Sequence, residues 1–216
     1  MPITLFSFNR KLSIKTKLVV GLFLSACLSE QAFAVLTTTS MVTTPRRLTL
    51  QVGSALFGTV NSVTFNVTSD KVSPNNTPIE GIPSATAGTA AASPTNGILI
   101  RLTSEIPTTM SNTWQNVKLT VDSPVGLACI SGTGCGSTVI PFSTISWTSY
   151  NHGTTAAGFD LSDGAFSGGS TQTLFWVGSY NSGLKMENTL VFTYANSTLY
   201  PAGQYTGRVT YTATLP

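Results

Sequence analysis

The sequence predicts an all-β protein, an antiparallel β-sandwich that forms a single domain. Short segments alternate apolar and polar residues with the period of a half-buried strand, as in Val209, Tyr211 and Ala213. Gly, Pro and Asn separate these segments at short intervals. After the amino-terminal segment, no stretch combines helical periodicity with capping residues. Roughly eight or nine such strands with turns between them favour immunoglobulin-like Greek-key connections.

Residues 1–34 have the pattern of a secretory signal peptide. Basic residues precede the apolar run Leu18–Leu28, and Ala32-Phe33-Ala34 places small residues at the −3 and −1 positions of a cleavage site. The run is too short for a membrane anchor. We therefore expect cleavage after Ala34 and export to the periplasm, cell surface or a fimbrium. In the alternative, Leu24-Ser25-Ala26-Cys27 is a lipobox, and lipidation of Cys27 gives an outer-membrane lipoprotein.

Removal of this segment changes the charge balance. The chain has 11 basic and 8 acidic residues, and four of the basic and one of the acidic residues precede Val35. Seven of each sign remain, so the mature chain has no excess positive charge for binding nucleic acid or anionic lipid. We also expect no membrane span in the mature chain.

The mature chain begins with an extended arm, residues 35–47, which Pro45 interrupts. The sandwich domain follows at residues 48–216. Within it, residues 69–96 form a predicted surface loop rich in Pro, Ala and Thr. Alternating or β-branched residues predict strands on both sides of this loop, at 48–52, 60–67, 97–103, 114–121, 139–147 and 171–178. The strand at 139–147 is expected to be irregular at Pro141.

The last stretch, Leu190–Pro216, predicts two strands joined by a turn. Leu190, Phe192 and Tyr194 alternate with polar or smaller residues, and turn residues occupy 196–203. After Gly207 the alternation resumes, with a threonine-rich face that we expect to be exposed to water.

Two cysteines remain in the mature chain, Cys129 and Cys135. In an exported protein an isolated pair predicts a disulfide, here closing the small loop CISGTGC. A zinc site is the weaker alternative, because His152 is the only histidine and two thiolates do not complete four ligands.

The segment LYPAGQYTGRVTYTA, residues 199–213, resembles the carboxyl-terminal ending of bacterial chaperone–usher pilin subunits and of spore coat protein U-like secreted proteins. The shared pattern is Pro/Ala-Gly-x-Tyr-x-Gly/Asp-x-Val followed by an alternating terminal strand. The resemblance covers this segment alone.

The resemblance implies an immunoglobulin-like fold without its last strand, which a periplasmic chaperone and then a neighbouring subunit complete by β-augmentation. It implies that Val209, Tyr211, Ala213 and Leu215 line the partner-strand edge. Residues 35–44 would be the donor arm. Only Leu36 and Val42 are bulky in one register of this arm, so polymerisation and a self-complete domain both stay open.

A catalytic site is not expected. His152 lies in a predicted loop, and Asp160 and Asp163 lie in a turn-like FDLSDG segment that does not match a calcium-binding loop. No nucleophile elbow, zinc-protease or phosphate-binding motif occurs. We therefore expect a non-enzyme without cofactor or metal.

The sequence favours an exported structural or adhesive cell-surface protein, a pilin-like fimbrial subunit. The alternative is a self-complete, lectin-like sandwich that binds a host or surface glycan. In that case Trp114, Trp147 and Trp176 are candidates for stacking on sugar rings, although burial in the core is the simpler role of each.

Overall fold

The computed structural model describes residues 46–53, 62–72, 77–84, 93–105, 114–153, 159–169, 171–180 and 183–215. The chain divides into two compact units, Met1–Phe33 and Ala34–Pro216, and every described residue belongs to the second. The predicted signal peptide, Cys27 and residues 35–45 of the predicted arm lie outside the described residues.

The described residues form antiparallel strands and two short 3-10 helices, η1 (Ser69–Lys71) and η2 (Phe142–Thr144), with no α-helix among them. The predicted all-β, antiparallel fold class is confirmed. Threonine, valine and aromatic residues dominate the strands, as expected for pleated, half-buried surfaces.

The largest sheet, called here the β12 sheet, has six strands. Its order is β1 (Arg47–Val52), β5 (Ile98–Glu105), β12 (Leu184–Tyr194), β9 (Ile145–Tyr150) and β10 (Gly164–Ala165), and β3 (Ile79–Glu80) also pairs with β12. β12 is buried on both faces at Asn188–Phe192, because it lies at the centre of this sheet.

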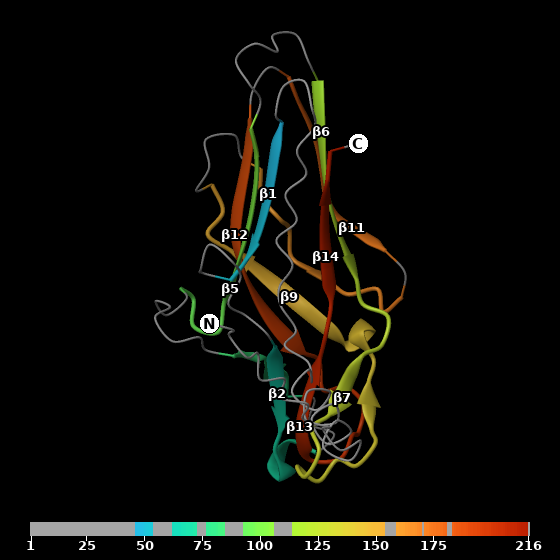
Figure 1. Cartoon of the computed structure of the whole chain (residues 1–216). Helices are drawn as coiled ribbons and strands as arrows, with labels where there is room; N and C mark the ends of the chain where they lie inside the picture. Colours follow the sequence, from blue (N-terminus) through green and yellow to red (C-terminus); the bar gives the residue numbers. More distant parts are fainter. Residues whose placement is uncertain are drawn as a thin grey trace, which may run out of the picture. The chain divides into compact units, whose positions relative to one another are not determined.

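Two further sheets complete the domain. The β6 sheet has the order β11 (Gln172–Tyr180), β6 (Trp114–Asp122) and β14 (Thr210–Thr214). The β13 sheet has the order β4 (Ile82–Pro83), β2 (Val63–Val67), β13 (Gly203–Gly207), β7 (Leu127–Cys129) and β8 (Val139–Ile140). In Figure 1, β1, β5 and β12 lie on one side of the domain and β6, β11 and β14 on the other.

One apolar core joins the sheets. Alternate residues of β5 and β6 point into it, and the β6 residues Val117, Leu119 and Val121 have no exposed surface. Leu184 and Met186 of β12 and Phe65 of β2 belong to the same cluster. The period-two pattern of the sequence is thus the pattern of side chains that the sheets bury against each other.

One prediction about local structure is wrong, and one irregularity that the sequence indicated is present. The expected loop at 69–96 contains β3 and β4, which are only two residues long and carry no readable alternation. The strand expected at 139–147, irregular at Pro141, is divided at that proline into β8, η2 and β9, because Pro141 lacks the N–H that a sheet interior needs.

The final segment is also divided differently from the prediction. The chain enters a strand at Gly203, inside the expected turn, and β13 belongs to a different sheet from β14. The interruption at Arg208–Val209 lies beside the interruption between β6 and β7, since the backbone of Gly126 approaches Gly207 at the end of β13. Pro124 falls in that second interruption, where it cannot donate to a ladder.

Candidate partner-strand site

Among the described strands, the carboxyl-terminal strand β14 forms hydrogen-bonded pairs along one edge only. Its register with β6 places Tyr211 opposite Val121 and Ala213 opposite Leu119. Within the part of the chain that the structure describes, no strand pairs with the other edge of β14. An unpaired edge presents backbone N–H and C=O groups that another extended chain can bind.

The inward face of β14 is apolar but incompletely covered. Tyr211 and Ala213, with Val209 and Leu215 at the strand ends, are half-buried and pack against the core. Thr210, Thr212 and Thr214 are exposed on the opposite face. These are the four residues and the threonine face that the sequence pattern assigned, so the alternation was interpreted in the correct phase.

Tyr211 is the one residue of this face with a polar group. Burial raises the pKa of its hydroxyl above the usual value. No described residue forms a hydrogen bond with that hydroxyl. A half-buried hydroxyl without a protein partner can hydrogen-bond to water or to an incoming chain.

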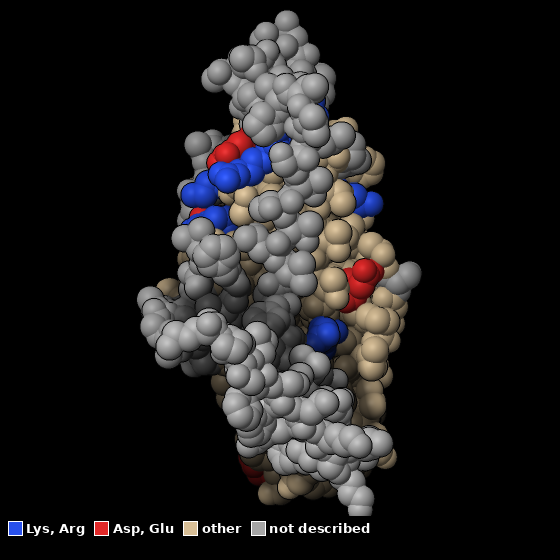
Figure 2. Space-filling view, in the orientation of Figure 1, with Lys and Arg blue, Asp and Glu red and all other residues tan. Residues whose placement is uncertain are grey.

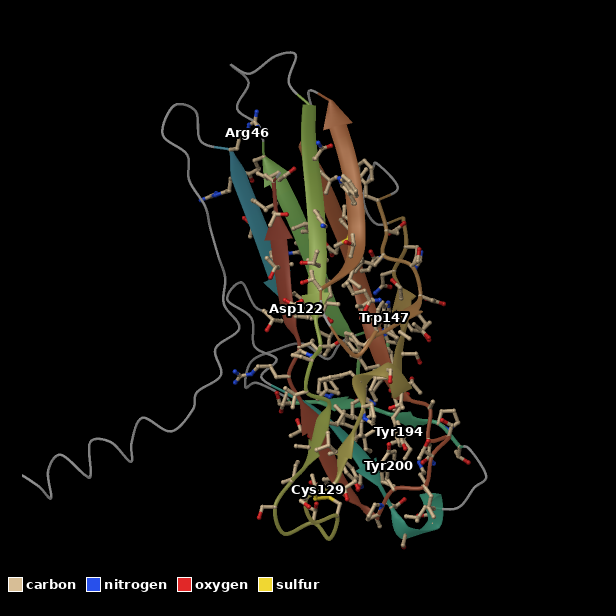
Figure 3. All side chains as sticks on the ribbon, turned by 90° about the vertical axis from the view of Figure 1, so that its right-hand side faces the viewer. Arg46, Asp122, Cys129, Trp147, Tyr194 and Tyr200 are labelled. Atoms are coloured by element: carbon tan, nitrogen blue, oxygen red, sulfur yellow. A yellow bond between two sulfur atoms is a disulfide. The ribbon has the colours of Figure 1, made fainter. Side chains whose placement is uncertain are left out.

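The edge of β14 lies beside the edge of β1. The two strands run side by side in opposite directions in both ribbon views, and Cα atoms of one come within 8 Å of the other (Figures 1 and 3). Among the described residues β1 pairs only with β5. Because neighbouring strands lie about 4.8 Å apart, a strand inserted between two others needs roughly 9–10 Å. Insertion here would require the two edges to separate where they are closest.

The residues before β14 make close contacts that explain the Pro-Ala-Gly-x-Tyr-x-Gly pattern. Tyr205 is fully buried, and its hydroxyl donates to the carbonyl of Pro201 at 2.7 Å. A Cβ on Gly203 would collide with Sγ of Cys135 and lie 2.7 Å from its Cβ. A Cβ on Gly207 would lie 2.7 Å from the carbonyl oxygen of Gly126. Both glycines are therefore required by close approach.

Cys129 and Cys135 form the predicted disulfide, with Cα atoms 5.7 Å apart (Figure 3). The loop between them binds the edge of β13. The N–H of Ile130 donates to the carbonyl of Gln204 at 2.8 Å, and the N–H of Gln204 donates to Oγ1 of Thr133 at 3.0 Å. The disulfide thus stabilises β13 and not only its own turn.

The structure separates the tryptophans that were considered for glycan stacking. Trp147 is buried, packs against Phe166 with ring centroids 5.1 Å apart and donates from Nε1 to the carbonyl of Ser162. It has no exposed face for a sugar. Trp176 is 69% exposed on β11. The backbone of Trp114 lies in β6 opposite Tyr180, and its side chain is outside the described set.

Polar residues at 152–153 and 159–163 contact β9 and β12. Asp160 accepts hydrogen bonds from the N–H of Gly153 and from Nδ2 of the fully buried Asn188. Asp163 accepts from the N–H of Ser149, and Nε2 of His152 donates to the carbonyl of the same serine. These contacts give the three residues structural roles. The described residues contain no group of three or more His, Cys, Asp or Glu side chains that could hold a metal ion.

Charges on the β12 sheet are paired, two of the pairs across strands and one, Lys185 with Glu187, within β12. Arg101 lies 2.8 Å from Glu187, Lys185 lies 3.3 Å from the same carboxylate, and Arg47 lies 3.9 Å from Glu105. Figure 2 shows basic and acidic side chains next to each other in the upper part of this view. None of the helices in the described ranges is long and apolar enough to cross a bilayer.

Comparisons with known proteins found no similar protein. No protein-family model, no curated protein and no solved structure matches this chain.

Two contacts in this region could not be predicted from the sequence. The burial of Asn188 depends on a loop that folds back from residues 159–163, and the contact of Gly203 with Cys135 joins positions 68 residues apart. The only signal in the sequence was indirect, namely glycines at fixed spacing around Tyr205.

Proposed function

We propose that this protein is an exported, non-catalytic structural or adhesive subunit of a bacterial cell surface, resembling pilin subunits, whose strand β14 accepts an extended strand from a partner. The observation that carries the proposal is the one-sided pairing of β14. Its inward residues are half-buried, and the adjacent edge of β1 also lacks a second partner among the described strands.

An immunoglobulin-like connectivity is supported by two features. The order β1-β5-β12-β9 on one side and β11-β6-β14 on the other suits a two-layered sandwich with Greek-key crossovers. Tyr205 follows the connection from β12, and its hydroxyl bonds to the backbone four residues upstream. This contact matches the tyrosine corner of immunoglobulin-like domains.

A partner strand would gain hydrogen bonds and buried area. Each backbone hydrogen bond contributes about 0.5–1.5 kcal/mol net. Covering the remaining surface of Tyr211, Val209 and Leu215 contributes about 25 cal/mol per Å². Several such terms together are enough for stable binding of an extended segment, provided that β1 and β14 separate to admit it.

Two occupants are consistent with the resemblance. A periplasmic chaperone would provide a strand of bulky apolar residues, and a neighbouring subunit would provide its own residues 35–44. This donor arm has fewer bulky apolar side chains, since Thr38 and Ser40 separate Leu36 from Val42. A chaperone strand is therefore the tighter partner, and exchange with the polar arm would be less favourable than with a fully apolar one.

The proposal is tested by producing the full-length chain in a bacterial host with and without a pilus-type chaperone. We expect degradation or aggregation without the chaperone and a stable complex with it. Intact mass reports cleavage after Ala34 or lipidation at Cys27. A soluble, stable monomer made without the chaperone, with β14 amides as protected from hydrogen exchange as those of β13, would overturn the proposal.

Two matched variants localise the effect to the edge. Ala213→Asp places a charge on the inward face of β14, and Thr212→Asp places the same charge on the exposed face. We expect the first to abolish recovery of the chaperone complex and the second to leave it nearly unchanged. Equal loss in both variants would argue against binding at this edge.

A further inference from the structure

The outward face of the β6 sheet carries a large exposed indole. Trp176 lies in the middle of β11 and is 69% exposed, although tryptophan is normally well covered in folded domains. The regular pairing of β11 with β6 holds its backbone in place. A rigid, solvent-facing indole is a common anchor for ligands and partners.

The neighbours of Trp176 are defined by the strand register. Lys118 lies opposite it on β6, with Nζ 5.9 Å from the ring centroid, and Thr214 of β14 lies opposite Lys118. The next outward position on β11 is Gly178, opposite the exposed Asn116. The indole therefore has a cation on one flank and an open backbone position on another.

The cation beside the ring has no carboxylate partner among the residues that the structure describes. This distinguishes Lys118 from Arg101 and Lys185, which both contact Glu187. Asp122 is four residues further along β6, which is about 13 Å at the rise of a strand. A ligand anion at Lys118 would thus add a favourable charge interaction without displacing one.

These groups together define a ligand chemistry. An aromatic face binds the apolar C–H face of a sugar ring, threonine and asparagine side chains bind hydroxyl groups, and an unpaired ammonium binds a carboxylate. A single lysine is too little charge for an anionic membrane surface, and the seven-to-seven balance after Ala34 gives no basis for nucleic-acid binding.

We infer that this face, formed by Trp176, Lys118, Asn116 and Thr214, binds an acidic saccharide, a glycan that contains uronic acid. The sugar ring stacks on the indole beside Gly178, and its carboxylate pairs with Nζ of Lys118. The site lies on the surface of the β6 sheet and does not depend on occupation of the β14 edge.

The inference is tested by calorimetric titration of the purified exported protein with trisaccharides of galacturonic, glucuronic and mannuronic acid, each compared with its neutral methyl ester. We expect at least one acid to bind, and its ester to bind about fivefold or more weakly, since an ion pair is lost. Binding of no trisaccharide, or equal binding of acid and ester, would overturn the inference.

Variants locate the site. Trp176→Ala should reduce affinity about tenfold or more, and Trp176→Phe by a smaller factor, because part of the aromatic face remains. Lys118→Gln should remove the preference for acid over ester, whereas Lys185→Gln, an equal charge change on the β12 sheet, should leave it intact. Unchanged affinity in Trp176→Ala, with the fold verified by its unfolding midpoint, would contradict the site.

Discussion

Strands β13 and β14 are consecutive parts of one carboxyl-terminal segment, and they end in different states. β13 pairs with β2 on one side and β7 on the other, and its Tyr205 is fully buried with a hydrogen-bonded hydroxyl. Within the described ranges β14 pairs with β6 alone, and its Tyr211 is half-buried with no described partner for its hydroxyl. The same alternating pattern thus produces a completed strand and an incomplete one, depending on what lies alongside.

The largest expected effect concerns β13, the strand that is paired on both edges. Gly203→Ala should destabilise the protein by about 2–4 kcal/mol, because the new methyl group collides with the disulfide at Cys135. Urea unfolding measures the change. Gly169→Ala is the matched control, since a Cβ there meets no atom within 4 Å, and its effect should be within about 0.5 kcal/mol. Equal effects of the two variants would show that β13 does not need the close approach.

The second effect concerns the disulfide. Replacing Cys129 and Cys135 together by Ala should cost about 2 kcal/mol, as expected for a loop this small. Hydrogen exchange should accelerate at Gln204, which the loop contacts, more than in β14. Equal acceleration of hydrogen exchange in β13 and β14 would mean that the disulfide stabilises the whole domain and does not distinguish the two strands.

The third effect compares the two tyrosines directly. Tyr205→Phe should cost about 1 kcal/mol, because a partly buried hydrogen bond to the carbonyl of Pro201 is lost. Tyr211→Phe should change the free energy of unfolding by less than about 0.5 kcal/mol, since no described bond is lost. Chemical denaturation gives both values. A large cost for Tyr211→Phe would reveal a partner for its hydroxyl.

The smallest effect is a dependence on alkaline pH. Burial raises the pKa of Tyr211 and of Tyr205 above 10.0, and it raises that of Tyr194 to about 12. The unfolded chain therefore ionises first, so this contribution to stability is complete below about pH 10 and is lost as pH rises further. Tyr211→Phe should reduce the loss of stability as the pH rises above about 10. An unchanged slope would mean that the inward face of β14 is well hydrated.

Alternation predicted β6, β11 and β14 and the inward set from Val209 to Leu215, because a period of two survives wherever one face is buried. It could not predict β3, β4 or β10, which are two residues long and exist only because longer strands lie beside them. It also could not distinguish the buried Trp147 from the exposed Trp176, since both occupy strands. Exposure depends on which sheet covers each face.

By itself the sequence determined the all-β class, the pairing of Cys129 with Cys135 and the phase of the last strand, because each follows from local spacing and composition. Only the tertiary structure decided that β13 and β14 belong to different sheets, that Gly203 lies on the disulfide and that one edge of β14 has no described partner. Those outcomes depend on contacts between residues far apart in the chain, such as Gly203 with Cys135, and no local pattern encodes them.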